Sequence, residues 1–279
     1  MKHKPAHLDG PYMETHPDNT DFEWHSPEPP FTYLSNAQVE SFDKRGFCLV
    51  EDVFSREEIH SVMDALDPLE REASDYLRTQ HGGRYGISQA EGIVFNPHAV
   101  MRDPVLREFA RHEVFVGLTR DLIGDDVRLY WDQLVYKKLE ADQEFPWHQD
   151  NGYTFVVPQQ YVTCWVALTD ATIENGCPWV LPGEHTRGTL KHRWTDYGFA
   201  CLEDPEGAVP IEARSGSVVV FSSLTPHCTG PNRTQSIRKA YILQYAPDGT
   251  MVYPRDGEPA RANHPDRQFE VVRSGKPVD

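Results

Sequence analysis

Two histidines and one aspartate carry the clearest chemical signal in this sequence of 279 residues. His148 and Asp150 form an HxD triplet, and residues i and i+2 of a strand project from one face, about 7 Å apart along the backbone. A third histidine, His227, follows Asp150 after 77 residues. Two imidazoles and one carboxylate on one side of a metal leave coordination positions open, which suits non-haem Fe(II) oxygenases. The sequence therefore predicts an iron site made of these three side chains.

Arg238 extends this pattern, because it follows His227 by 11 residues, at the start of a β-rich run. A guanidinium binds a carboxylate through two parallel hydrogen bonds, which a lysine does less well. An HxD triplet alone arises often by chance, and a single histidine or arginine is usually structural or on the surface. Order, spacing and strand context together favour a metal site beside an arginine that binds a carboxylate co-substrate.

Two further histidines compete as metal ligands. His185 and His192 lie seven residues apart and could in principle form a zinc pair. No cysteine or carboxylate stands at a convincing spacing from them, so we interpret both as loop histidines. Cys228 follows His227 directly, and in an extended segment its side chain would face the opposite way.

Composition limits the class of protein and its partners. Hydrophobic residues make up 39% and charged residues 25%, as in globular proteins. The net charge of −16 would repel phosphate backbones, so we expect neither nucleic acid nor an anionic membrane as a partner. No apolar run approaches the roughly 20 residues of a membrane helix, and no apolar stretch follows residues 1–5 as in a signal peptide. Five cysteines without a CxxC pair favour reduced thiols and a cytoplasmic location.

The expected organisation is a polar arm over residues 1–30 and a single domain over residues 31–279. Within that domain we expect a helical part over about 35–124, a β core over about 125–250 and a C-terminal extension over 251–279. Ser35 and Ser55 each begin a capping-box pattern, which predicts two helices. Pro104, preceded by an aspartate, predicts a third helix that ends at Gly124.

The pattern then changes to a period of two. Over residues 127–135, apolar and polar side chains alternate in a way that predicts one strand with two distinct faces. One face would hold Val127, Leu129, Trp131, Gln133 and Val135, and the other would hold Arg128, Tyr130, Asp132 and Leu134. Residues 161–168, 217–221 and 240–245 are further β-rich runs. Short strands between glycine, proline and asparagine turns indicate an antiparallel sandwich or barrel.

Several of these motifs resemble the phytanoyl-CoA dioxygenase (PhyH-like) family. Residues 146–153, with the sequence PWHQDNGY, are similar to the metal motif of that family. Residues 163–170 (TCWVALTD) and 174–177 (ENGC) are similar to the segments that follow it. Residues 181–185 (LPGEH) resemble the Pro-Gly-Ser-His turn of the family, with Glu184 where serine is usual. The likeness covers roughly residues 34–250.

The resemblance implies a mainly β fold with flanking helices and a double-stranded β-helix core, also called a jelly roll and found in cupins. It implies Fe(II) as the metal, 2-oxoglutarate as the co-substrate and O₂ as the oxidant. His148, Asp150 and His227 match the iron ligands of the family, and Arg238 matches the arginine that binds the distal carboxylate of 2-oxoglutarate. The other residues expected to contact the co-substrate are Thr229, Gln133, Lys137 and Trp165.

The expected activity is hydroxylation of a small-molecule metabolite at an unactivated C–H bond, with succinate and CO₂ as co-products. Asp150 favours hydroxylation over halogenation, because halogenating relatives replace this carboxylate with a small residue. An acyl-CoA hydroxylase is one alternative, although the acidic chain offers no basic patch for the negative charges of CoA. A metal-binding jelly-roll protein without catalysis and a zinc or manganese hydrolase-like cupin are the others. The sequence predicts no oligomeric state.

One glycine-rich segment could contact the substrate. Residues 81–86 (HGGRYG) are predicted to form a loop, either a lid over the site or an ordinary connection. On weaker grounds we also expect Glu91, Asn96 and Tyr153 to face the site.

Overall fold

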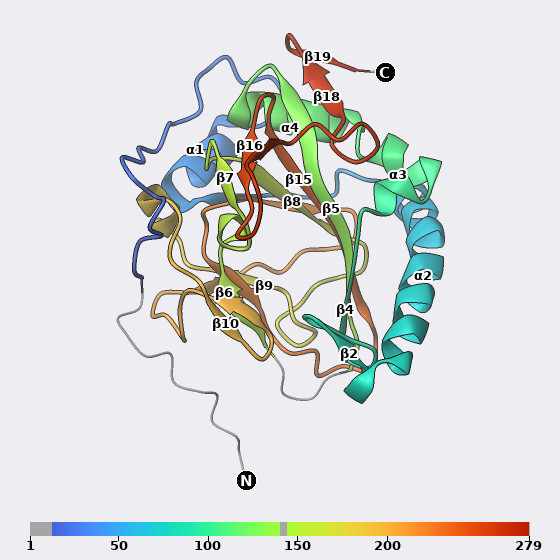
Figure 1. Ribbon diagram of the computed structural model, residues 1–279. Helices are drawn as coiled ribbons and strands as arrows, with labels where there is room; N and C mark the ends of the chain where they lie inside the picture. Colours follow the sequence, from blue (N-terminus) through green and yellow to red (C-terminus); the bar gives the residue numbers. More distant parts are fainter. Residues whose placement is uncertain (1–12, 140–143, 279) are drawn as a thin grey trace.

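Two antiparallel β-sheets form the centre of the computed structural model, which describes residues 13–139 and 144–278 (Figure 1). Along the main path of the larger sheet, the strands follow the order β1 (Phe47–Val50), β13 (Val218–Ser222), β8 (Val162–Ala167), β15 (Arg238–Pro247), β5 (Val127–Lys137), β18 (Glu270–Arg273) and β19 (Lys276–Pro277). In addition, β4 (Ile93–Pro97) pairs with β5. The smaller sheet follows the order β12 (Val209–Pro210), β9 (Pro178–Val180), β14 (His227–Thr229) and β6 (Phe145–His148). The expected mainly β fold with a jelly-roll core is confirmed.

Helices and short hairpins surround these sheets. The α-helices are α1 (Asn36–Arg45), α2 (Arg56–Thr79), α3 (Pro104–Phe109) and α4 (Glu113–Ile123). Single 3-10 turns are η1 (His81–Gly83), η2 (Ala99–Met101), η3 (Asp150–Gly152) and η4 (Glu184–Arg187). The remaining strands are β2 (Arg84–Tyr85), β3 (Ser88–Gln89), β7 (Phe155–Val157), β10 (Arg193–Thr195), β11 (Gly198–Ala200), β16 (Met251–Tyr253) and β17 (Ala260–Arg261). None of the described helices combines the length and apolar character that crossing a lipid bilayer requires.

The larger sheet has one face toward the helices and one toward a cavity. On β15, Tyr241, Leu243 and Tyr245 pack in the same cluster as the apolar faces of the helices, and Tyr245 stacks on Phe115 of α4 with ring centroids 5.5 Å apart. Burial of one such side chain contributes about 1.5–3 kcal/mol. Ile242 points the other way, into the cavity. The helices thus cover one face of the larger sheet, and the opposite face lines the cavity.

The first two helices begin where the sequence predicts, but the predicted third helix differs from the structure. Ser35 and Ser55 both form complete capping boxes, which confirms α1 and α2. The single helix expected from Pro104 to Gly124 is wrong, because the chain forms α3 and α4 with a break between them. The side chain of His112 accepts a hydrogen bond from the amide of Val114 and so caps the start of a new helix.

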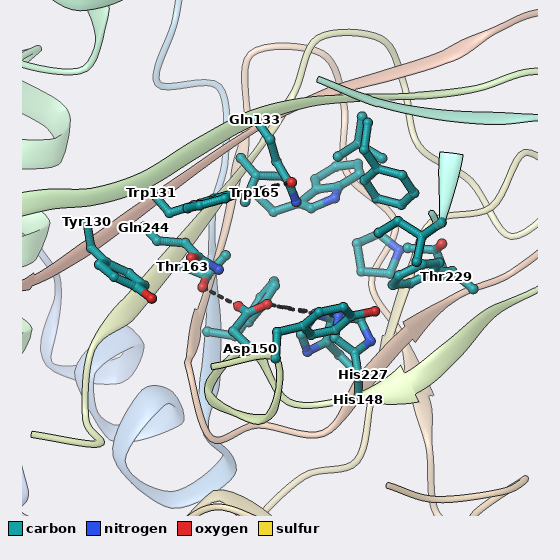
Figure 2. Close-up of a pocket in the computed structure, with 18 of the residues that line it drawn as sticks. Tyr130, Trp131, Gln133, His148, Asp150, Thr163, Trp165, His227, Thr229 and Gln244 are labelled. Carbon is teal, nitrogen blue, oxygen red and sulfur yellow. Dashed lines mark hydrogen bonds and ion pairs between the residues drawn. The ribbon is translucent and has the colours of Figure 1, made fainter. Parts of the chain in front are cut away.

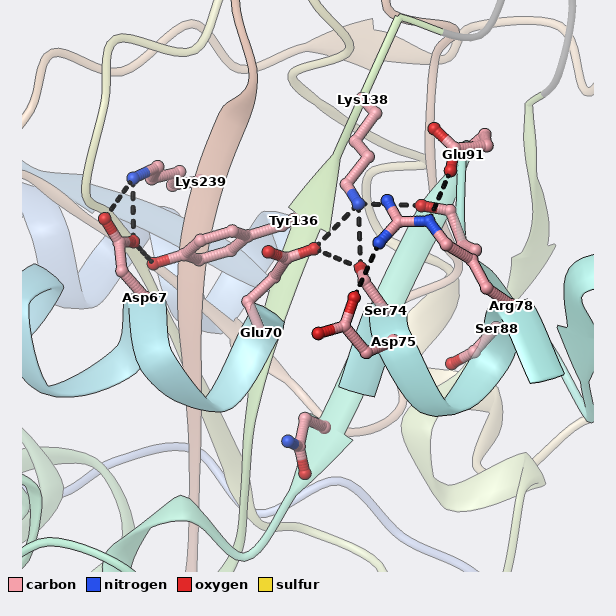
Figure 3. Close-up of polar contacts among 12 residues, drawn as sticks. Asp67, Glu70, Ser74, Asp75, Arg78, Ser88, Glu91, Tyr136, Lys138 and Lys239 are labelled. Atoms are coloured by element: carbon pink, nitrogen blue, oxygen red, sulfur yellow. Dashed lines mark hydrogen bonds and ion pairs between the residues drawn. The ribbon is translucent and has the colours of Figure 1, made fainter. Parts of the chain in front are cut away.

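Polar contacts fix α2 to the strands of the larger sheet (Figure 3). Asp67 accepts hydrogen bonds from the Tyr136 hydroxyl and the Lys239 ammonium, both at 2.7 Å. One turn later, Glu70 pairs with Lys138 at 2.8 Å. Because β5 and β15 carry several cavity residues, these contacts also hold the cavity wall in place.

An irregularity in β5 overturns part of the expected alternation. Between Gln244 and Tyr245 of β15 the register skips one residue of β5, Tyr130, which therefore forms a bulge. On its N-terminal side, Val127 and Leu129 pack in the helix-facing core rather than beside the cavity. The side chains of β5 that line the cavity are Tyr130, Trp131, Gln133 and Val135.

The described part of the N-terminal arm, residues 13–30, lies against the domain. The backbone of Thr15 bridges Leu190, and the amide of His16 donates to the carbonyl of Thr189 at 2.9 Å. Further along, the Trp24 indole donates to Asp43 of α1 at 2.8 Å. The arm is thus held by backbone pairing as well as by side chains.

Candidate metal and co-substrate site

The two histidines of the expected triad lie side by side on the smaller sheet. His148 ends β6, His227 begins β14, and the register pairs them directly, with ring centroids 4.1 Å apart. Asp150 comes from η3, and its Oδ1 lies 3.9 Å from the Nε2 atom of each histidine (Figure 2). One ligand atom of each residue lies within 4.8 Å of the others, and among the described residues no other group of three such side chains does so.

The HxD motif reaches this geometry by a different route from the one expected. The strand ends at His148, and Asp150 already belongs to the 3-10 turn that follows. Strand alternation therefore does not bring the two side chains to one face. The turn folds Asp150 back toward the histidines, and Thr163 of β8 donates a hydrogen bond to Asp150 Oδ2 at 2.5 Å. This contact leaves Oδ1 facing the imidazoles.

The local hydrogen bonds fit a divalent metal. Nδ1 of His148 lies 2.8 Å from the Pro146 carbonyl, and Nδ1 of His227 lies 3.0 Å from the Thr225 carbonyl. Each Nδ1 therefore carries the proton, and each Nε2 has a lone pair for a metal. Burial and the neighbouring His227 also lower the pKa of His148, which favours the neutral, ligating form. Two imidazole nitrogens and one carboxylate oxygen thus make a donor set that fits Fe(II).

A buried glutamine inside the motif supports the two candidate ligands, and the sequence analysis missed it. Gln149 donates to the carbonyls of Leu224 at 2.6 Å and Gly188 at 3.0 Å, and its Oε1 accepts from the amide of Leu190 at 2.6 Å. Its own amide donates to Nε2 of His192 at 2.8 Å. The backbone between His148 and Asp150 is therefore fixed to two other segments, residues 188–192 and the loop at Leu224.

The interpretation of His185 and His192 as ordinary loop histidines is thus incomplete. Neither joins the metal group, but both are fully or nearly fully buried. The ring of His185 lies against Trp24 and contacts the Asp43 carbonyl at 3.0 Å. Burial lowers the pKa of His192 to about 4, so this ring stays neutral and keeps its acceptor.

Replacing Gly152 with alanine is expected to weaken both folding and metal binding. A Cβ atom at this position would lie 2.0 Å from Cε1 of His192, so the ring or the turn after Asp150 must move. Overpacking of this kind costs about 1–3 kcal/mol of unfolding free energy. Thermal unfolding and Fe(II) titration of G152A would measure the two effects. Unchanged values for both would show that the turn and His192 do not support the ligands. Gly86→Ala is the control for a loss of stability alone. Its Cβ meets nothing within 4 Å, but the φ of +57° at this position strains any side chain, so the variant should lose stability and keep its Fe(II) affinity.

Arg238 is buried, and no described residue provides a counterion for it. Its side chain is 0% exposed, and its Nε and Nη2 atoms have no hydrogen-bond partner among the described residues. Nη1 donates a long bond of 3.4 Å to the Val135 carbonyl, and the guanidinium lies 5.2 Å from the Trp165 ring centroid. Burial lowers the pKa of Arg238 to about 10, so it remains a cation at neutral pH. A desolvated cation of this kind fits a carboxylate ligand.

The other expected co-substrate residues divide into two groups. Thr229, Gln133 and Trp165 line the cavity that also contains the triad. Arg238 and Lys137 are both absent from the described lining. Arg238 lies against Val135 and Trp165, which do line the cavity. The Lys137 ammonium donates to the carbonyls of Thr229 and Gly230. Its contacts therefore brace the segment after His227.

Of the residues expected to face the site on weaker grounds, only Tyr153 does so. Glu91 pairs with Arg78 of α2 (Figure 3). Asn96 donates to the Leu69 carbonyl. Neither residue is in the described lining, so both expectations are wrong. The 81–86 segment forms η1 and the start of a hairpin, from which the next residue, Ile87, lines the cavity.

Comparison with known proteins identifies the family. The family described as phytanoyl-CoA dioxygenase (PhyH) matches residues 42–240. A phytanoyl-CoA dioxygenase of Arabidopsis thaliana is 23% identical over 271 residues, which cover 84% of this chain and 96% of the relative. An ectoine dioxygenase of Bordetella bronchiseptica is 26% identical over 267 residues, which cover 86% of this chain and 85% of the relative.

Solved structures share the fold. EctD from S. alaskensis, in complex with 2-oxoglutarate and 5-hydroxyectoine, aligns with a TM-score of 0.65 at 22% identity and covers 93% of this chain and 96% of its own. The epimerase SnoN, in complex with Fe3+, alpha-ketoglutarate and nogalamycin RO, aligns with a TM-score of 0.64 at 22% identity and covers 87% of this chain and 94% of its own.

Proposed function

The chain belongs to the phytanoyl-CoA dioxygenase (PhyH) family and is an Fe(II)- and 2-oxoglutarate-dependent oxygenase, and we propose that it hydroxylates a small-molecule metabolite at a C–H bond through His148, Asp150 and His227. The observation that carries this proposal is the convergence of two free Nε2 atoms and one carboxylate oxygen at the cavity wall. The intact carboxylate supports hydroxylation rather than halogenation, because it takes the position that a halide would need.

Each residue of the proposed site has a defined task. The carbonyls of Pro146 and Thr225 keep the two histidines in the tautomer that ligates, and Thr163 keeps Asp150 turned toward them. When bound, Fe(II) with 2-oxoglutarate and O₂ supplies the oxidising chemistry and yields succinate and CO₂.

Arg238 is proposed to bind the distal carboxylate of 2-oxoglutarate, with Thr229, Gln133 and Trp165 around the same co-substrate. Lys137 contributes through the backbone that it holds after His227. The aromatic rings of Phe145 and Phe221 pack at 4.9 Å and 4.4 Å from the two imidazoles. They shield the ligands from water.

The size of the cavity supports a small substrate. Its volume of about 290 Å³ is just below the roughly 300–1,000 Å³ typical of small-molecule sites, and the cavity must also hold 2-oxoglutarate. A CoA group would lie outside it, against a chain of net charge −16. Because all five cysteines are buried and free, we also propose a reducing, cytoplasmic location.

Metal replacement tests the proposed function. The purified protein is expected to convert 2-oxoglutarate to succinate when Fe(II) is added, to stop when Fe(II) is chelated, and to remain inactive with Zn(II). The readout is succinate formed in the absence and presence of candidate metabolites and of an acyl-CoA. Binding of Fe(II) without succinate formation under any of these conditions would favour a non-catalytic metal protein, and hydrolysis with Zn(II) would favour a hydrolase-like cupin.

A further inference from the structure

The cavity continues past the triad, away from Arg238. Arg238 and Gln244 lie on the same face of β15, six residues apart, so about 20 Å of strand separates their Cα atoms. Across the sheet, Gln244 pairs with Trp131 of β5 on one side and with Thr163 of β8 on the other. We call the part of the cavity beside these residues the distal half, lined by Tyr130, Trp131, Tyr161, Thr163 and Gln244.

Gln244 holds an unused carboxamide beside the proposed iron ligands. Its side chain makes no hydrogen bond to any described residue, although the residue is only 6% exposed and lines the cavity. Gln244 of β15 pairs with Thr163 of β8, and the Thr163 hydroxyl donates to Asp150, one of the proposed iron ligands. A single residue therefore connects Gln244 to that ligand. Figure 2 shows the Gln244 amide turned toward the same space as the Tyr130 hydroxyl. A buried amide without a hydrogen-bond partner is unfavourable, so a ligand that supplies the partner is bound more tightly.

The bulge in β5 adds the phenol of Tyr130 to the same space, next to that of Tyr161. It directs Tyr130 into the cavity next to Trp131, and the rings of Tyr130 and Tyr161 pack with centroids 5.3 Å apart. Burial raises the pKa of both tyrosines, so each keeps its proton at neutral pH. Both therefore offer neutral O–H groups.

Formal charge is absent from the distal half. Among the described residues that line the whole cavity, the ionisable groups are the triad and tyrosines, with no lysine, arginine or second carboxylate. At the triad, the formal charges of Asp150, Arg238, a ferrous ion and the 2-oxoglutarate dianion cancel. A charged substrate group would thus lose its hydration without gaining a counterion.

We propose that the substrate presents an uncharged hydrogen-bonding group, such as an amide, lactone or hydroxyl, to Gln244, with an apolar part against Trp131, and that Gln244 determines specificity. This inference rests on the proposed function, because it assumes that 2-oxoglutarate occupies the Arg238 end. A site with a polar group placed to hydrogen-bond the substrate discriminates strongly against ligands that lack the matching group.

Three probes of similar size and different charge test the inference. Benzamide, benzoate and benzylammonium share a ring that can pack on Trp131 and differ in the group offered to Gln244. Isothermal titration of each into the anaerobic Fe(II)- and 2-oxoglutarate-loaded protein measures their dissociation constants. Benzamide is expected to bind about tenfold more tightly than either ion, the equivalent of one net hydrogen bond.

Variants of Gln244 provide the second arm. Q244L is expected to lose the roughly tenfold advantage of benzamide, and Q244E is expected to prefer benzylammonium. Gln235 lies exposed in the loop before β15, so Q235L is the matched control and should behave as the unchanged protein. Circular dichroism and cooperative thermal unfolding establish that each variant folds.

The two proposals fail in different ways. Absence of 2-oxoglutarate binding to the Fe(II)-loaded protein contradicts the proposed function. Where 2-oxoglutarate does bind, three results overturn the present inference alone. They are no detectable binding of benzamide, binding of either ion as tight as that of benzamide, and a benzamide preference that Q244L leaves intact.

Discussion

Alanine at Asp150, at His148 or at His227 is expected to abolish Fe(II)-dependent succinate formation from 2-oxoglutarate. The three ligand atoms lie within 4.8 Å of one another, so the loss of any one leaves two ligands and a gap in the coordination sphere. Loss of a partner that only orients a ligand costs about 10–100-fold in metal affinity. Direct loss of a ligand should cost more. Fe(II) titration and succinate formation without added substrate measure the two effects.

Two control variants show whether the effect is specific to the metal. Thr163→Val removes only the hydrogen bond to Asp150 Oδ2, so it should weaken Fe(II) binding by about 10–100-fold and leave some turnover at high Fe(II). Asp64→Ala removes an exposed carboxylate of α2 and should change neither property. Full turnover in both D150A and H148A would contradict the proposed site.

Arg238→Met is expected to weaken 2-oxoglutarate binding by about 30- to 4,000-fold. Loss of one partner of a buried, hydrogen-bonded charge pair costs about 2–5 kcal/mol, and each 1.4 kcal/mol is a factor of ten. The same change should raise the thermal stability of the protein without 2-oxoglutarate, because it removes a cation buried away from any described counterion. Titration of 2-oxoglutarate and thermal unfolding with and without it test both directions.

Arg238→Lys separates charge from geometry in this experiment. Lysine keeps the positive charge but cannot form the two parallel hydrogen bonds of a guanidinium, so an intermediate affinity is expected. If R238M binds 2-oxoglutarate as well as the unchanged protein, the co-substrate carboxylate lies elsewhere. A hydrolase-like cupin would also keep its activity in R238M.

The first two helices and the candidate triad could be predicted because they follow from local signals, whereas the jelly-roll core was implied by the resemblance to the family. The capping boxes at Ser35 and Ser55 depend on residues three positions apart, and both helices begin where these boxes predict. The triad was predictable from residue type and order alone, although its geometry depends on η3 and not on strand alternation.

Features that depend on distant partners were not predictable from one sequence. The bulge at Tyr130 is a mismatch in length between β5 and β15, and nothing in either strand alone shows it. It reverses the faces of Val127 and Leu129 relative to strict alternation. The role of His192 likewise depends on its contact with Gln149, 43 residues earlier in the chain.

The N-terminal arm connects to the proposed iron motif through a single intervening segment. His16 donates its amide to Thr189, whose hydroxyl accepts a hydrogen bond from Asn151, the residue after Asp150. Asn19 bonds the carbonyls of Arg187 and Thr189. A shortened protein that starts at Trp24 would keep both sheets and all three proposed ligands. It would lose the hydrogen bonds of His16 and Asn19 to the segment that contacts Asn151. A protein trimmed in this way for crystallisation would therefore have a less constrained turn beside Asp150 than the full chain has.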